Sequence, residues 1–265
     1  MTDDATGRLL DRFLAAIRPV VPVVSVWAHG SLAGGDYQPG RSDLDLIAVL
    51  DRPCTSEEER LIEEAHEHLG SAMSLASKLH CSYVATAEAA DPARPHLTWA
   101  QEELMRRPVT PVTRRELHAF GLVLHGEAPE SILPAVTDGE LTDFVISDLG
   151  DFWQPSLEHP EWYLNDIWVD LGMLTLARAT VTLREGRLIT KREALDVLGD
   201  LDAPVEVIDD IRRRRYGTHT ASTEEWLIHR AGLTLAFLGS AIDRAVTAHR
   251  SDRGDDLAPR SSEHL

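Results

Sequence analysis

The stretch Trp27-Ala28-His29-Gly30-Ser31 and, after a loop, the stretch Asp43-Leu44-Asp45-Leu46-Ile47-Ala48-Val49 decide the fold of this chain. The first stretch ends an apolar run and the second is largely apolar, so both predict strands. Successive side chains of a strand point to opposite faces. Asp43 and Asp45 therefore share one face, while the leucines that alternate with them enter the core.

The turn between the two predicted strands is suited to a phosphate. Gly30 has no side chain and lets the backbone approach a phosphate closely, and Ser31 adds a hydroxyl and an N–H. The paired carboxylates are hard oxygen ligands for Mg²⁺, which itself binds a triphosphate. A plain hairpin whose turn happens to hold Gly, Ser and Asp would leave two carboxylates in an apolar strand unexplained. We therefore predict a site for a triphosphate and Mg²⁺.

The charge balance bears on the partner. The chain has 26 basic and 44 acidic residues, a net charge of −18, whereas nucleic-acid binders need a basic surface. The one basic cluster, 212–215, is expected on a solvated helix end. The sequence therefore predicts no nucleic-acid partner and weakly favours a cationic one, although acidic surfaces also serve solubility. No feature of the sequence specifies an oligomeric state.

Cysteine content and hydropathy indicate the compartment. Only Cys54 and Cys81 are present, without the paired spacing of a disulfide framework or a zinc site. The first residues are acidic where a signal peptide would be basic, and no apolar run reaches the length of a membrane span. We expect a cytoplasmic protein without a membrane partner.

Two halves follow from the pattern of elements. In the first half, strands are predicted over 23–27, 44–50 and 78–85, a capping box Ser56/Glu59 opens a helix, and a short helix is predicted around 99–107. This order predicts an α/β domain with a mixed sheet over 1–130.

The second half, 131–250, is predicted to be an all-α bundle. Three further capping boxes open helices, Thr137/Glu140, Thr190/Glu193 and Ser222/Glu225, and a long helix over 162–185 ends at Gly186. The segment 251–265 has little to bury and is predicted to be a disordered tail.

The Gly-Ser turn followed by Asp-hydrophobic-Asp resembles the nucleotidyltransferase superfamily of DNA polymerase β. The runs 174–178 and 183–194, together with 116–126, are similar to the helical domain and the linker of the aminoglycoside adenylyltransferases that modify streptomycin and spectinomycin. The resemblance implies an ATP- and Mg²⁺-dependent transfer of AMP to a hydroxyl of a small cationic acceptor, such as an aminoglycoside. Asp43 and Asp45 would then be catalytic metal ligands, and Gly30 and Ser31 would bind the nucleotide.

In that family ATP lies between the two domains. The resemblance implies that Arg178 and Lys191 contact its phosphates and that Tyr216 lines the same site. The placement of Lys191 is physically reasonable, because Thr190 caps the helix and the first turn of a helix favours an anion. A solvent-facing Lys191 and an Arg178 paired along its own helix are the alternative.

The chain departs from the family at the third carboxylate, which the family uses as a general base on the next core strand. That strand here reads Lys78-Leu79-His80-Cys81-Ser82-Tyr83-Val84, without an acidic residue. His80 best occupies the expected position, and a histidine can act as a general base. His80 is alternatively only a polar residue at the edge of the site, or the protein binds a nucleotide without efficient transfer.

The acceptor-binding residues of the family are also out of register here. Asp166 and Asp170 lie four residues apart on one helix face and are candidates for a cationic sugar, as is Trp99 through stacking. Each is explained at least as well as an ordinary surface residue. Two other functions stay open: a regulatory or antitoxin-like nucleotide-binding protein without turnover, and an enzyme that adenylylates a protein hydroxyl.

Overall fold

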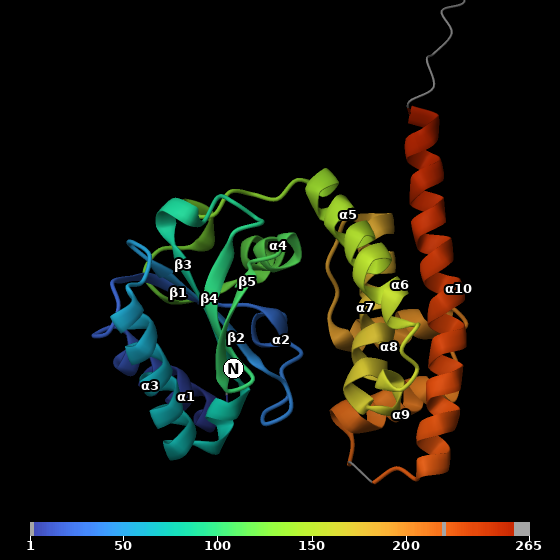
Figure 1. Ribbon diagram of the computed structural model, residues 1–265, viewed down its shortest axis with the longest axis horizontal. Coiled ribbons are helices and arrows are strands. Elements are labelled where there is room, and N and C mark those ends of the chain that lie inside the picture. The colour runs from blue at the N-terminus through green and yellow to red at the C-terminus, as the bar shows by residue number, and fades with distance from the viewer. Residues whose placement is uncertain (1–2, 219–220, 257–265) are drawn as a thin grey trace, which may run out of the picture. The chain divides into compact units, whose positions relative to one another are not determined.

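The computed structural model describes residues 3–218 and 221–256 (Figure 1). The chain forms two compact units, Met1–Thr137 and Asp138–Leu265. Each unit is described by itself. Among the described residues, no helix combines the length and the apolar character needed to cross a membrane.

The first unit is built on a six-stranded sheet with the order β5-β4-β3-β2-β1-β6. Its strands are β1 (Val23–Ala28), β2 (Leu44–Leu50), β3 (Leu79–Ala85), β4 (Pro95–Ala100), β5 (Glu103–Pro108) and β6 (Leu122–His125). β2 and β3 pair in parallel, and the other neighbours are antiparallel. The predicted mixed sheet is therefore confirmed, and its first two strands have the predicted bounds to within a residue.

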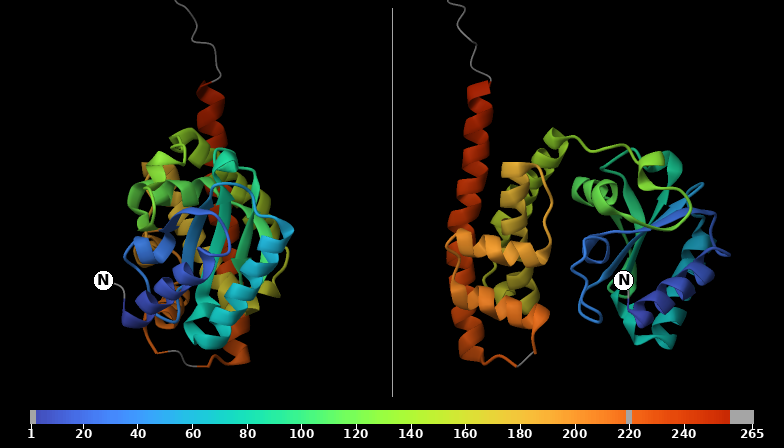
Figure 2. Two further views of the ribbon diagram at one scale, coloured as in Figure 1. Left: turned by 90° about the vertical axis from the view of Figure 1, so that its left-hand side faces the viewer. Right: turned by 180° about the vertical axis from the view of Figure 1, so that it is seen from behind.

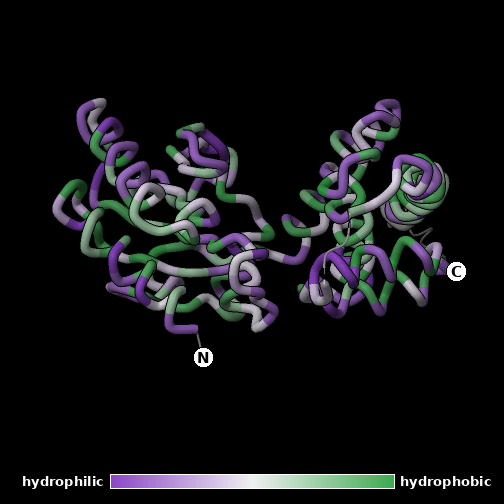
Figure 3. The backbone as a smooth tube through the Cα atoms, turned by 90° about the horizontal axis from the view of Figure 1, so that it is seen from below, coloured by the Kyte–Doolittle hydropathy of each residue, from purple (hydrophilic) through white to green (hydrophobic). Residues whose placement is uncertain are grey.

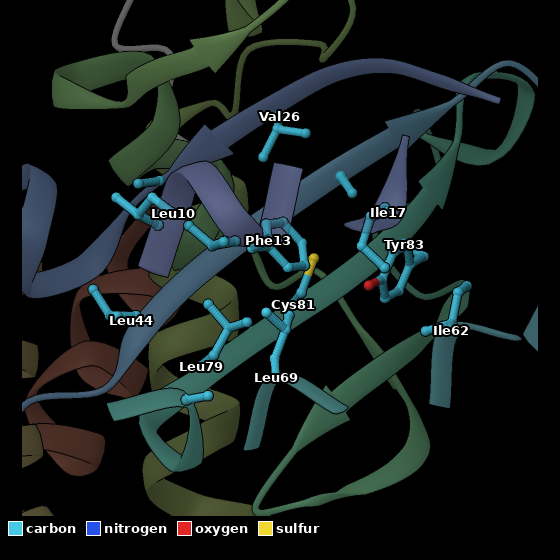
Figure 4. Close-up of a cluster of buried hydrophobic side chains, with 14 of the residues drawn as sticks. Leu10, Phe13, Ile17, Val26, Leu44, Ile62, Leu69, Leu79, Cys81 and Tyr83 are labelled. Carbon is cyan, nitrogen blue, oxygen red and sulfur yellow. The ribbon is translucent and has the colours of Figure 1, made fainter. Parts of the chain in front are cut away.

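Helices α1 (Asp4–Ile17) and α3 (Ser56–Ala72) cover one face of the sheet (Figure 2). Leu9 and Phe13 of α1 and Ile62 of α3 are fully buried there with the strand residues Leu44 and Leu79. Figure 4 shows Phe13, Ile62 and other side chains of this core against the strands of the sheet. Burial of each such side chain contributes about 1.5–3 kcal/mol, so this face holds the larger core of the unit.

The opposite face carries a second, smaller core. Trp27 of β1 and Ile47 of β2 are buried here together with Leu117 of α4 (Pro111–Phe120). The indole of Trp27 donates a hydrogen bond of 2.7 Å to the carbonyl oxygen of Glu127, just beyond β6. The short helix α2 (Gly30–Ala33) follows β1 directly. Successive side chains of a strand point to opposite faces of the sheet. The strand residues adjacent to those that pack on α1 and α3 therefore face α4.

The predicted helix around 99–107 is wrong, because this segment forms the hairpin of β4 and β5. Trp99 pairs with Leu104, and the turn is made by Gln101 and Glu102, with φ of 55° and 64°. Residues other than Gly rarely adopt positive φ, so the local sequence gives no sign of this turn. The helix-favouring residues at 103–107 pair as a strand through tertiary packing.

The caps of two helices lie one residue away from their predicted positions. α3 begins with a capping box of Thr55 and Glu58 instead of Ser56 and Glu59. α10 begins at Glu224, where the hydroxyl of Thr223 accepts the N–H of Trp226, in place of the predicted Ser222. Each site has two adjacent Ser/Thr residues that can cap the helix, and the chain uses the first of them at α3 and the second at α10.

The second unit is helical, as predicted. It contains α5 (Asp138–Ser147), α6 (Gln154–Ser156), α7 (Asp166–Glu185), α8 (Lys191–Asp200), α9 (Val205–Tyr216) and α10 (Glu224–Asp256). A π-helical segment, Asp148–Trp153, joins α5 to α6, and a short 3-10 turn lies at Trp162–Leu164. The first unit has further 3-10 turns at Ser74–Lys78, Thr86–Glu88 and Pro129–Ser131. Hydrophobic and hydrophilic positions alternate along the helical turns (Figure 3), so each helix buries one side.

Two of the predicted helix ends in the second unit are confirmed, and one prediction is wrong in part. The capping box of Thr190 and Glu193 at α8 is confirmed, and Gly186 ends α7 with the left-handed φ of 68°. α10 runs to Asp256, so it includes residues 251–256 of the predicted tail. The remainder of that tail, 257–265, lies outside the described residues.

Candidate nucleotide and metal site

The two aspartates lie together at the start of β2. Asp43 immediately precedes the strand and Asp45 is its second residue, and their side chains are 45% and 31% exposed. Leu44 and Leu46 are buried on the other side. The alternation predicted from the sequence is confirmed. The Nζ of Lys78 lies 3.6 Å from Oδ1 of Asp43, a partly exposed ion pair that a metal ion can displace at small cost.

Gly30 lies directly against Asp45. Its φ is +60°, and a Cβ at this position would come within 2.7 Å of Oδ2 of Asp45. The preceding residue, His29, donates its backbone N–H to the carbonyl oxygen of Asp45 at 3.0 Å. Both the conformation and the space therefore require glycine here. Ser31, which follows, lies in α2.

His80 is aligned with Asp45 by the parallel pairing of β2 and β3. Nδ1 of His80 lies 3.5 Å from Oδ1 of Asp45, and the histidine side chain is 16% exposed. The sequence placed His80 on the strand next to the aspartates, and the structure brings the two side chains together. No acidic residue lies on β3 (Leu79–Ala85), so the imidazole is the titratable group that β3 itself presents beside Asp45.

A pocket of about 220 Å³ lies beside this group within the first unit. Asp45 and His80 line it together with His29 and with the hydroxyls of Ser82, Thr110 and Thr113. Residues 107–110, from the end of β5 and the connection to α4, form the rest of the wall together with Thr113 of α4. The pocket has room for a hydroxyl-bearing group but not for a whole drug-sized ligand.

Two residues of this site were missed by the sequence analysis, His29 and Glu116. Oε2 of Glu116 lies 3.1 Å from Nδ1 of His29 and accepts the N–H of Gly30 at 3.2 Å. Glu116 is on α4, 87 residues from His29. Only the Gly-Ser turn was recognisable as a local motif. A contact between segments so far apart leaves no local pattern in the sequence.

The donor atoms present fit Mg²⁺. Among the described residues, no group of three or more His, Cys, Asp or Glu side chains is arranged to hold a metal ion. Mg²⁺ is commonly held by one or two carboxylates together with substrate phosphates and waters. Asp43 and Asp45 supply such a pair of carboxylates, and the backbone of Gly30 lies against Asp45 without an intervening side chain.

The residues of the second unit implied by the family resemblance lie near one another. Lys191 is the first residue of α8, at its capped N-terminus. Nε of Arg178 donates to the carbonyl oxygen of Ile189 at 3.0 Å, which places this guanidinium near the same helix end. The ring of Tyr216, at the end of α9, lies under the guanidinium of Arg192 at 4.1 Å. A cationic group is thus present where a helix N-terminus also favours an anion.

Asp166 and Asp170 lie in an ion-pair network instead of a free acidic face. Arg230 is fully buried and donates to Asp166 at 2.6 Å and to Asp210 at 3.1 Å. Arg214 pairs with Asp170 and Asp210. Burial raises the pKa of Asp170, against the opposing effect of Arg214. Two arginines already compensate these carboxylates, so we do not retain them as acceptor-binding residues.

Trp99, which the sequence offered as a stacking surface for a cationic sugar, lies in the core instead. It is 4% exposed, and its ring stacks on His66 with centroids 4.7 Å apart. Trp99 pairs with Cys81 of β3 and shares its face of the sheet. His80, the residue just before Cys81, points to the opposite face. Trp99 therefore belongs to the core under α3, away from Asp45.

Comparisons with known proteins bear on the family and the fold. Residues 10–80 match the family of nucleotidyltransferase domains. The fold resembles the crystal structure of a spectinomycin adenyltransferase from Enterococcus faecalis with ATP and spectinomycin, with a TM-score of 0.69 and 14% identity over 89% of this chain and 99% of that chain. No curated protein matches the sequence. The predicted resemblance, a nucleotidyltransferase domain in an aminoglycoside adenylyltransferase-like fold, is confirmed.

Proposed function

We propose that this nucleotidyltransferase-fold protein uses ATP and Mg²⁺ to transfer AMP to a hydroxyl of a small cationic acceptor of the aminoglycoside type. The proposal depends chiefly on one observation. Gly30 lies against Asp45, and Asp43 is two residues before Asp45 on the same face. A backbone turn without a side chain thus adjoins a pair of carboxylates. This combination suits a triphosphate and its metal ion.

Asp43 and Asp45 are proposed to hold the metal, and Ser31 is proposed to bind the phosphates. When bound, Mg²⁺ would neutralise charge on the triphosphate. In the second unit, Arg178 and Lys191 are proposed to contact phosphates, and Tyr216 is proposed to contribute to nucleotide binding. The support for these last three is the family resemblance, together with the grouping of Arg178 and Lys191 near the capped start of α8.

The transfer itself is an in-line displacement. The acceptor hydroxyl oxygen forms a bond to the α-phosphorus, the bond from that phosphorus to the bridging oxygen breaks, and pyrophosphate leaves with the electron pair. The hydroxyl proton needs an acceptor, and His80 is proposed for this role. Nδ1 of His80 is directed toward Asp45, so Nε2 is the nitrogen left for the proton. The hydroxyls that line the pocket, Ser82 and Thr110, can orient the acceptor.

The charge of the chain supports a cationic acceptor. A net charge of −18 attracts cations over long range and disfavours polyanionic acceptors such as nucleic acids. The structurally similar Enterococcus protein was crystallised with spectinomycin. This points to aminoglycosides and aminocyclitols as the first acceptors to test.

A second candidate function has one observation in its favour. β3 carries His80 where the family resemblance leads one to expect a carboxylate base, and this difference is compatible with a protein that binds a nucleotide for regulation without turnover. The two functions differ in product formation but share ATP binding.

One experiment tests both functions. The purified protein is incubated with α-labelled ATP, Mg²⁺ and a panel that includes streptomycin, spectinomycin and kanamycin, and labelled acceptor is resolved by chromatography. Label on an acceptor, absent from the Asp45→Asn variant, supports the transferase. ATP binding by calorimetry without any labelled product supports the regulatory alternative, and absence of both contradicts the nucleotide site.

A further inference from the structure

A buried carboxylate from α4 contacts the Gly-Ser turn. Oε2 of Glu116 accepts a hydrogen bond from the backbone N–H of Gly30 at 3.2 Å and lies 3.1 Å from Nδ1 of His29. The side chain of Glu116 is only 7% exposed and that of His29 is 14% exposed. A carboxylate at such a depth requires hydrogen-bond donors, and the turn supplies them.

The other side of the same turn is held by β2. The N–H of His29 donates to the carbonyl oxygen of Asp45, and Gly30 leaves no space for a Cβ beside Oδ2 of Asp45. His29 and Gly30 are thus fixed between Asp45 and Glu116. Glycine loses the most conformational freedom on ordering, so a turn at φ +60° is expected to need contacts of this kind.

We infer that Glu116 is a positioning residue for the proposed transfer, a clasp that fixes the Gly30 turn against the metal-binding Asp45. The inference rests on the proposed function, because the turn must then hold a triphosphate in line for attack. Errors of about 1 Å in such an alignment can cost roughly 10²-fold in rate. Glu116 touches the turn and His29, and it acts through them on the reacting groups.

The clasp also determines which donors remain for the nucleotide. The N–H of Gly30 is already bonded to a carboxylate, and a phosphate oxygen would meet negative charge there. The phosphates are therefore held by Ser31, while Gly30 contributes space and conformation. Gly30 thus keeps the backbone role that its missing side chain predicted, while its own N–H is bonded to Glu116.

Hydrogen exchange measured by mass spectrometry tests the clasp without relying on activity. In Glu116→Ala, the peptide spanning 27–33 should exchange about tenfold faster than in the parent, because the N–H of Gly30 loses its charged acceptor. Glu116→Gln keeps an acceptor oxygen and should stay within about threefold of the parent. Glu103→Ala, an exposed carboxylate on β5, is the matched control and should leave this peptide unchanged. Unchanged exchange in Glu116→Ala would overturn the clasp.

Steady-state kinetics with the best acceptor of the panel test the positioning role. Glu116→Ala should lower kcat about 10–100-fold while KM for ATP changes less than about threefold, and Glu116→Gln should recover most of the lost kcat. A rise in KM for ATP that matches the fall in kcat would overturn the positioning role, as would parental kcat in Glu116→Ala. If the parent itself transfers no AMP, the proposed function fails while the exchange experiment still decides on the clasp.

A folding defect is controlled separately. Thermal melts by circular dichroism accompany each variant, and Glu116→Asp replaces Glu116→Ala if the latter fails to fold. The aspartate keeps the charge but is shorter by one methylene, so it should also speed exchange over 27–33. Slow, parental exchange in Glu116→Asp would count against the clasp.

Discussion

The imidazole of His80 lies beside the carboxylate of Asp45, with Nδ1 3.5 Å from Oδ1. The parallel register of β2 and β3 sets these two residues opposite each other, so the histidine is the group on β3 nearest to the proposed metal ligand. Substitutions at position 80 therefore probe the chemistry of the site directly.

His80→Ala should lower kcat for a hydroxyl acceptor roughly 10²–10⁴-fold and leave ATP affinity almost unchanged, because a lost proton acceptor affects the chemical step. His80→Glu introduces the carboxylate that the family resemblance implies at this position and should retain or raise activity. Rapid-quench measurement of AMP transfer checks both, with the exposed His68→Ala as control. Parental rates in His80→Ala would assign the proton to another group.

Asp43→Asn and Asp45→Asn should each abolish AMP transfer, because both carboxylates are needed for the metal. The fold should persist, and melting temperatures measured without metal should be unchanged or slightly raised, since two neighbouring carboxylates repel each other. The control is Asp51→Asn, an exposed aspartate just beyond β2. Transfer at the parental rate in either variant would remove that residue from the metal site.

ATP with Mg²⁺ should raise the melting temperature of the parent by mass action. Lys191→Ala should weaken this shift, because Lys191 and the N-terminus of α8 both favour an anion. Calorimetry gives the affinities, with the exposed Arg187→Ala as the control cation. Equal ATP affinity in the parent and in the Lys191→Ala/Arg178→Ala double variant would make both residues structural.

Buried His66 should make the first unit sensitive to acid. Desolvation lowers its pKa in the folded protein from 6.5 to about 3, so between these values the unfolded chain binds the proton and the folded chain does not. The free energy of unfolding should fall as the pH drops from about 6.5 toward 3, by up to about 1.4 kcal/mol per unit. Urea titrations over this range should show that His66→Gln loses this dependence and that the exposed His68→Gln keeps it.

The network around Arg230 should matter for stability more than for acceptor binding. Arg230→Leu leaves Asp210 buried with one cation fewer, and breaking a buried pair typically costs about 3–5 kcal/mol. Urea unfolding measures the loss, and the exposed Arg212→Leu should change stability by less than about 0.5 kcal/mol. Unaltered stability in Arg230→Leu would show that the network is dispensable.

The sequence predicted the parts of this molecule that local pattern determines. The strand over 44–50, the alternation of Asp43 and Asp45 with buried leucines, and the capped start of α8 were all readable, because each depends on a few adjacent residues. His80 was placed correctly beside the aspartates because a two-residue period fixes which side chains share a face.

Features that depend on distant segments were missed. The hairpin of β4 and β5 turns through Gln101 and Glu102, which carry no turn signature. The pattern of its own helix predicted that Asp170 could bind a cationic sugar, but Asp170 is paired with Arg214 of α9. Glu116 reaches the Gly-Ser turn from 87 residues away. Contacts between residues far apart in the sequence determine these features, and a short stretch of sequence does not contain both partners.

The hydrogen bond from Trp27 to the carbonyl oxygen of Glu127 has a consequence for synthesis on the ribosome. β6 and this bond complete the edge of the sheet beside β1, and Glu116 lies on the helix just before them. Asp45 is made roughly 80 residues earlier than Glu127, which at about 5–20 residues per second is a delay of about 4–16 s. During that interval the nascent chain holds both aspartates while the β1 edge still lacks its neighbouring strand. The site is therefore among the first parts of the first unit to be synthesised and among the last to be completed.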